Sequence, residues 1–215
     1  MPETEGAGSA HPTTLTEEFG HIDIYLFDQL LREHVKPGMR VLDAGCGHGR
    51  NLVYLLQHGF DVSAVDRSPE AVAKTAALAA RLAPELPPTQ FRLETLESLS
   101  FPDASFDLVV CSAVLHFAKD PVHFNAMVTE LWRVLAPAGL FFARLASSIG
   151  IETQVVSLGS GRYHLPDGSE RYLVDESQLL TLTERLGGAL ADPIKTTNVQ
   201  GQRCMTTWVV KRPRG

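Results

Sequence analysis

The sequence contains no long apolar run, few cysteines, few aromatic residues and no excess of positive charge. No apolar stretch approaches the roughly 20 residues that a membrane-spanning helix needs, so we expect no membrane-embedded protein. The three cysteines (Cys46, Cys111 and Cys204) are far apart and lack CxxC or Cys/His ligand spacing, which predicts neither a disulfide framework nor a metal site. The formal net charge is −6, and no Lys/Arg cluster exceeds the short run at 211–214. A nucleic-acid partner is therefore disfavoured.

The composition that is present fits one folded domain. The chain has 215 residues, of which 44% are hydrophobic and 20% charged, enough for a full core. Residues 1–16 are polar, rich in Gly, Pro, Ser and Thr, and lack the basic start and apolar stretch of a signal peptide. We expect a disordered lead over 1–16, a single domain over 17–215, and a cytoplasmic protein.

Strand-like and helix-like segments alternate along most of the chain. Helical spacing of apolar residues predicts an N-terminal helix over 22–34 and further helices over about 49–58, 68–82, 120–135 and 175–186. Strands are predicted at 40–43, 62–65, 90–94, 107–111, 140–145, 193–197 and 205–210. Repeated βαβ units give a parallel sheet, and the last two strands, joined by a short turn at Gly201, must be antiparallel. The predicted fold is a doubly wound α/β sheet of seven strands, mostly parallel, with an antiparallel last strand.

The segment from Val41 to Gly49 is the most informative motif. It begins as a buried strand, carries the acidic Asp43 and ends in a turn with glycine at alternate positions. Such a turn, between the carboxyl end of a strand and the start of a helix, is where open α/β sheets bind ligands. A dinucleotide fingerprint needs a third glycine at the place of Arg50, and the Gly-Lys-Ser/Thr ending of a phosphate loop is absent.

With this motif the chain resembles the class I S-adenosylmethionine-dependent methyltransferases. The continuation through Arg50 and Asn51 is most similar to the tellurite-resistance and thiopurine-type small-molecule branch. The resemblance implies a Rossmann-like methyltransferase fold, S-adenosylmethionine as cofactor with S-adenosylhomocysteine as product, and in-line transfer of a methyl group to a small molecule. Two alternatives stay open: a methyltransferase of protein or RNA, and a non-catalytic S-adenosylmethionine-binding module.

The resemblance also assigns residues to the cofactor. Asp43 is expected to meet its ammonium group or to hold the loop, and Asp66, about 20 residues beyond the glycines, to meet the ribose hydroxyls. Arg67 lies along the adenine or points to solvent. Thr95 stands where the family usually has Asp before the adenine contact. The predicted cofactor-binding residues are Asp43, Ala44, Gly45, Cys46, Gly47, Gly49, Asp66, Arg67, Thr95, Leu96 and Cys111.

The exit loop of the fourth-strand motif, residues 106–116, faces both the cofactor and the substrate in this family. It lacks the Asn/Asp-Pro-Pro-Tyr/Phe and Pro-Cys signatures of the DNA-methylating branches. His116 is the candidate base or substrate contact because imidazole titrates near neutral pH; the alternative is a histidine satisfied by backbone. His123 is expected at the surface.

Residues 147–172 show no periodicity and form a candidate substrate cover. The predicted substrate contacts are Tyr163 and His164 within this segment and Arg144 just before it. The alternative is a small hairpin that turns at 166–169. On the opposite side, the N-terminal helix with His21 and Tyr25 is either a lid or plain packing.

Overall fold

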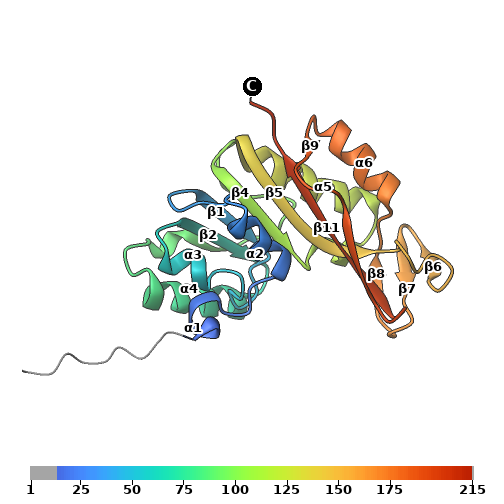
Figure 1. The fold of residues 1–215 in the computed structure, drawn as a ribbon, viewed down its shortest axis with the longest axis horizontal. Helices are drawn as coiled ribbons and strands as arrows, with labels where there is room; N and C mark the ends of the chain where they lie inside the picture. Colours follow the sequence, from blue (N-terminus) through green and yellow to red (C-terminus); the bar gives the residue numbers. More distant parts are fainter. Residues whose placement is uncertain (1–13, 215) are drawn as a thin grey trace, which may run out of the picture.

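The computed structural model describes residues 14–214, and its centre is a twisted sheet that crosses the whole molecule (Figure 1). Along the sheet the strands follow the order β3-β2-β1-β4-β5-β11-β10, with β9 pairing beside part of β11. The strands are β1 (Arg40–Ala44), β2 (Asp61–Asp66), β3 (Phe91–Leu93), β4 (Phe106–Ser112), β5 (Leu135–Ser147), β9 (Ala189–Leu190), β10 (Lys195–Val199) and β11 (Arg203–Lys211).

The pairing directions confirm the predicted fold class. Strands β1 to β5 are mutually parallel, whereas β11 runs antiparallel to both β5 and β10. The sheet has one strand more than predicted, because the two-residue β9 carries no readable pattern. Residues 136–139, which separate the predicted helix over 120–135 from the predicted strand at 140–145, are counted within β5. The register shift between Phe106 and Leu108 and the positive φ of Ala138 mark an irregularity there.

Helices cover both faces of the sheet. Apolar residues of α2 (Ile24–Leu31), α3 (Val53–Gln57) and α4 (Pro69–Leu82) pack on one face, and those of α5 (Pro121–Val134) and α6 (Glu176–Arg185) on the other. Three of the predicted helices begin with a capping residue: Ser68, Asp120 and Asp175 each accept a backbone N–H of the helix that follows. Two short 3₁₀ helices, η1 (Pro88–Gln90) and η2 (Leu115–Phe117), complete the connections.

The N-terminal region differs from the prediction. Helix α1 (Leu15–Phe19) begins inside the predicted lead, because Thr14 and Glu17 form a reciprocal capping box. It ends at Gly20, and Asp23 caps α2, which covers only the middle of the predicted 22–34 helix. Residues 1–13 of the lead lie outside the described residues.

Residues 147–172 contain regular structure. Strands β6 (Val156–Gly159), β7 (Arg162–His164) and β8 (Glu170–Tyr172) form a separate antiparallel sheet. This sheet projects beside the amino-terminal end of β11 (Figure 1). This matches the hairpin alternative, extended by one strand. All four β6 residues are exposed, including the apolar Val156 and Leu158, and a run of four residues is too short to predict a strand by its pattern.

Candidate functional site

A cavity of about 920 Å³ opens where β1, β2 and β4 end. The wall comes from the glycine turn after β1, the end of β2, the loop after β3, the segment from Ser112 to Phe117, and the link between α1 and α2. Carboxyl ends of parallel strands meet at one edge of the sheet, so these segments converge although they are far apart in sequence. Its volume falls in the range of small-molecule and cofactor sites.

The glycine turn folds tightly against the sheet. Gly45 has φ +80°, and a Cβ at this position would lie 2.4 Å from a methyl group of Val114. The N–H groups of Gly45 and Cys46 both donate to the carbonyl of Val65 in β2. Gly47 also has a positive φ, but a Cβ there would meet nothing within 4 Å. The turn therefore leaves bare backbone beside open space, where a ligand can approach closely.

Asp66 holds this turn and lines the cavity. Its Oδ2 accepts the N–H of Gly47 at 2.9 Å, and its Oδ1 accepts the N–H of Ser68 at 2.9 Å. The carboxylate is thus fixed in direction before any ligand arrives. Each oxygen of a carboxylate has a further lone pair, so it can still accept hydroxyl groups from the cavity side.

Asp43 lies behind the turn, only 1% exposed, and is not in the cavity wall. Its Oδ2 has no hydrogen-bond partner, so the predicted structural bond to the loop is not made by this atom. Burial raises the pKa of Asp43 to about 7; the charge of Arg50 opposes this rise and that of Asp66 adds to it. Because the folded pKa lies above the unfolded value, Asp43 lowers the unfolding free energy as pH rises from about 4 to about 7.

The predicted cofactor residues divide into two groups. Eight line the cavity: Gly45, Cys46, Gly47, Gly49, Asp66, Arg67, Thr95 and Leu96. Asp43, Ala44 and Cys111 lie beneath this wall, fully buried in or beside β1 and β4. Burial raises the pKa of Cys46 to about 12 and raises that of Cys111 further, so both are neutral thiols.

The structure does not place His116 at the cavity. The ring is 6% exposed, does not line the wall, and its Nδ1 accepts the N–H of Ala146 at 3.3 Å. Burial, reinforced by the charge of Arg171, lowers its pKa to about 4. The expected substrate-facing imidazole is corrected to a buried, neutral ring that satisfies backbone, which was the alternative reading.

The three predicted substrate residues are not brought together. Arg144, at the end of β5, points to Asp23 and is not in the cavity wall. Tyr163 lines a second, smaller cavity of about 500 Å³ beside α5 and α6. His164 is exposed on β7.

Several wall residues were not predicted for the site. His123 is in the wall, contrary to the expected surface position, with its Nε2 against Glu97 and its Nδ1 accepting the N–H of Lys119. His48 and Arg50 are in the wall as well, as is His21, which was considered only for a lid. Arg50 had a sequence signal, since it directly follows the glycine turn. His48 had the same signal, since it stands within the turn between Gly47 and Gly49. His21 and His123 had none, because only the packing of distant segments brings them there.

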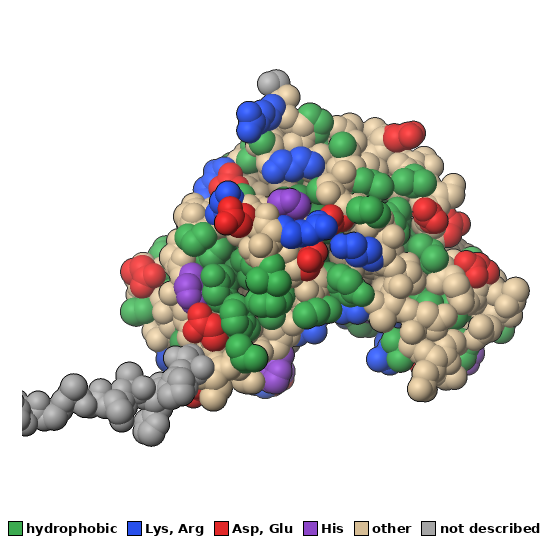
Figure 2. All heavy atoms as spheres, viewed as in Figure 1, with side chains coloured by type: hydrophobic (Ala, Val, Ile, Leu, Met, Phe, Trp, Pro, Cys, Tyr) green, Lys and Arg blue, Asp and Glu red, His purple; other side chains and the backbone are tan. Residues whose placement is uncertain are grey.

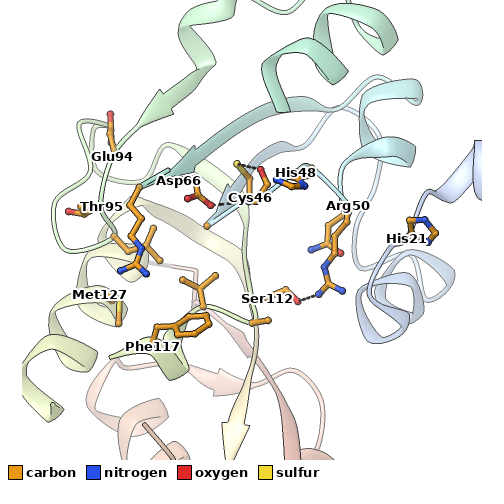
Figure 3. Close-up of a pocket in the computed structure, with 18 of the residues that line it drawn as sticks. His21, Cys46, His48, Arg50, Asp66, Glu94, Thr95, Ser112, Phe117 and Met127 are labelled. Atoms are coloured by element: carbon orange, nitrogen blue, oxygen red, sulfur yellow. Dashed lines mark hydrogen bonds between the residues drawn. The ribbon is translucent and has the colours of Figure 1, made fainter. Parts of the chain in front are cut away.

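The close-up in Figure 3 shows how the wall is ordered. Glu94 and Thr95 lie at one end, Asp66 and Cys46 near the middle, and Arg50 and His21 at the other end. The Nη2 of Arg50 donates to the Ser112 hydroxyl at 2.9 Å. The cavity is therefore elongated, with a carboxylate near its centre and a guanidinium beyond the glycine turn.

Comparison with known proteins identifies the central region. Residues 42–143, from β1 into β5, match the family described as methyltransferase domain. The chain is 35% identical over 117 residues to an uncharacterized methyltransferase of Synechocystis, covering 54% of this chain and 51% of that protein. It is 30% identical over 143 residues to the ubiquinone biosynthesis O-methyltransferase of Xanthomonas campestris, covering 61% and 56%. The chain thus spans about half the length of these curated relatives.

Solved structures share the fold. A structure described as a SAM-dependent methyltransferase from Methanosarcina mazei superposes with a TM-score of 0.70 at 20% identity, covering 86% of this chain and 98% of that one. The 1,6-didemethyltoxoflavin-N1-methyltransferase of Burkholderia thailandensis, solved with bound 1,6-didemethyltoxoflavin and S-adenosylhomocysteine, gives a TM-score of 0.65 at 22% identity, covering 86% of this chain and 75% of that one. The predicted Rossmann-like methyltransferase fold is confirmed, and the predicted family resemblance is supported over residues 42–143. The tellurite-resistance and thiopurine-type branch stays a prediction.

Proposed function

We propose that this chain is an S-adenosylmethionine-dependent methyltransferase that acts on a small molecule. The observation that carries the proposal is the elongated cavity, in which bare glycine backbone runs between the fixed carboxylate of Asp66 and the guanidinium of Arg50. This arrangement supplies partners for the separate polar parts of S-adenosylmethionine, in the order in which that molecule carries them.

The residues present fit the cofactor. Asp66 would accept the ribose hydroxyls, and the loop at Thr95 and Leu96 would border the adenine. Asp43 lies beneath the wall, so its ionised carboxylate would attract the ammonium group through the glycine turn and would not hydrogen-bond to it. Arg50, with 46% of its side chain exposed, would pair with the cofactor's carboxylate.

When bound, S-adenosylmethionine supplies a methyl group activated by positive sulfur. The protein's task is to orient the acceptor in line with that carbon and to exclude water. Acceptors that bind protonated also need a base. His123 already uses both ring nitrogens, so among the described wall residues His21 and His48 are the candidate bases.

The lobe made by β6, β7 and β8 supports the proposed substrate cover. Its Arg171 guanidinium lies 5.0 Å from the ring centroid of Phe117, which lines the cavity, and Arg162 donates to the carbonyl of Ala118 at 3.5 Å. In Figure 2 the lower edge of the molecule is indented between the main body and this lobe. The acceptor would enter between them.

A small-molecule acceptor is favoured by charge. The chain is acidic overall, and Lys or Arg side chains form no extended run in the sequence. Among the described residues, no helix is both long and apolar enough to cross a membrane. Cytoplasmic location and the single domain over 17–215 are retained as parts of this proposal.

Calorimetry tests the cofactor. The wild-type protein should bind S-adenosylmethionine and S-adenosylhomocysteine, and Asp66→Ala should weaken both by about 10- to 100-fold, the worth of charge-assisted hydrogen bonds. Unchanged affinity in this variant would remove the basis of the assignment.

Methyl transfer needs its own assay. Labelled S-adenosylmethionine incubated with panels of thiols, amines, phenols and oxyanions should yield labelled small product. Tight cofactor binding with no product from any panel would favour the non-catalytic module. Label appearing only in protein or RNA from extract would favour the macromolecular alternative.

A further inference from the structure

A buried ionic cluster joins the N-terminal segment to the cavity. The Asp23 side chain has no exposed surface, and its Oδ2 accepts from Arg144 Nη1 at 2.8 Å. The Ser112 hydroxyl donates to the same oxygen at 3.3 Å, and Arg50 Nη2 lies 3.7 Å away. The Asp23 N–H in turn donates to Asn51 Oδ1 at 2.9 Å. Residues from α2, the glycine turn, β4 and β5 thus meet at one carboxylate.

The cluster exceeds what capping α2 requires. The cap uses Oδ1, which accepts the N–H of Tyr25 at 3.0 Å, whereas Oδ2 serves the two guanidinium groups and Ser112. A fully buried carboxylate is costly unless its charge is paired. Oδ2 of Asp23 therefore has a role other than capping α2.

The charges in this cluster do not balance. Two guanidinium groups face one carboxylate, and Arg50 is the member that also lines the cavity. Ser112 and Asp23 hold Nη2 of Arg50 on its inner side. The rest of the Arg50 guanidinium group faces the cavity, beyond the glycine turn (Figure 3).

We propose that Asp23 is a positioning residue: it fixes Arg50 so that the guanidinium meets the carboxylate of S-adenosylmethionine, and it thereby couples cofactor binding to the N-terminal segment. The inference rests on the proposed function. Because the segment includes His21 in the wall, the Asp23 carboxylate that fixes Arg50 also holds one side of the acceptor space.

The chain offers a conservative variant and a matched control. Asp23→Asn keeps an oxygen that can cap α2 and removes the charge that faces Arg50. Asp192 is also a buried carboxylate that ties α2 to the body, through Gln29 and Arg32, and it is not in the cavity wall. Asp192→Asn therefore reports what loosening α2 alone does.

The probe pair is S-adenosylmethionine and its decarboxylated form, which keeps the sulfonium, nucleoside and ammonium groups. We expect Asp23→Asn to lose about 10- to 100-fold in affinity for S-adenosylmethionine and less than about threefold for the decarboxylated form. Arg50→Met should show the same selective loss, and adding Asp23→Asn to it should change little further, since coupled residues are not additive. Asp192→Asn should affect both ligands equally or not at all.

Equal losses of affinity for both ligands in Asp23→Asn would mean that Asp23 only shapes the N-terminal segment, and this would overturn the inference. Unchanged affinity for both ligands would overturn it as well. A wild-type protein that does not discriminate between the ligands would overturn it while leaving cofactor binding intact. A wild-type protein that binds neither ligand would instead refute the proposed function.

Hydrogen exchange on the wild-type protein gives a measurement that needs no folded variant. Peptides covering residues 20–31 should gain more protection with S-adenosylmethionine than with saturating decarboxylated ligand. Equal protection by the two would overturn the coupling.

Discussion

Gly45 is the position where the fold of the turn can be tested most directly. An alanine there meets two separate costs. The backbone has φ +80°, and holding an L-residue in the left-handed region costs about 1–2 kcal/mol. The added Cβ would also lie 2.4 Å from Val114 Cγ2 and 3.0 Å from Cγ1, far inside the usual carbon separation of about 3.5–4.0 Å.

The second cost can be estimated from Val114, which packs against the core on the α5 face. Forcing extra volume into a packed region costs about 1–3 kcal/mol, so Gly45→Ala should lower the unfolding free energy by about 2–5 kcal/mol in total. Gly59 is the matched control. It has φ +73°, and a Cβ there would meet nothing within 4 Å, so Gly59→Ala should cost only the backbone part.

Urea unfolding followed by circular dichroism measures both variants, with Gly47→Ala as a third. Gly47 has a positive φ and open space at its Cβ, so Gly47→Ala should resemble Gly59→Ala in stability but should weaken S-adenosylmethionine binding, because it lines the cavity. If Gly45→Ala unfolds with the same free energy as Gly59→Ala, the close approach of the turn to Val114 is wrong.

Three further outcomes follow from buried groups. Because all three cysteines are buried, native protein should not react with Ellman's reagent, whereas unfolded protein should show three thiols. His116→Leu should cost about 1–3 kcal/mol in urea unfolding by leaving the Ala146 N–H unpaired, and it should leave cofactor affinity within about threefold. From about pH 5 to about pH 8 the wild-type unfolding free energy should fall by about 2–4 kcal/mol relative to Asp43→Asn, because ionisation of the buried Asp43 opposes folding. Over the same range calorimetry should find cofactor affinity rising in the wild type and flat in Asp43→Asn, since the ammonium group favours the ionised form; parallel curves would contradict the placement of Asp43.

The fold was readable where local pattern and short connections determine it. The apolar strands, the helix caps at Ser68, Asp120 and Asp175, and the alternation of elements predicted the parallel sheet and its antiparallel end. Strands β6 and β9 were missed, because they are short and exposed and lack the burial pattern of a half-buried strand. Strands β7 and β8 correspond to the hairpin alternative that turns at 166–169. Helix α3 is shorter than predicted, since the residues after Gly49 are still part of the turn.

The sequence likewise predicted those site residues that belong to local features of the chain. Gly45, Gly47 and Asp66 could be predicted because a turn and a strand end are local features of the sequence, and all three line the cavity. The cluster at Asp23 could not be read, because Arg144 is 121 residues away and Ser112 is 89. Nothing in the sequence near Arg144 distinguishes a substrate contact from a partner of a distant carboxylate.

The cavity wall contains residues both inside and outside the match to the methyltransferase domain. The match to the methyltransferase domain covers residues 42–143, which contain the glycine turn, Asp66 and the loop after β3. It leaves out the segment with His21 and the lobe with Arg171, whose guanidinium lies over Phe117 in the cavity wall. The residues within this match therefore hold the half of the cavity that we assign to the cofactor, and the N-terminal segment and lobe outside it border the half that we assign to the acceptor. The proposed acceptor therefore has to be sought with the N-terminal segment and the lobe in place.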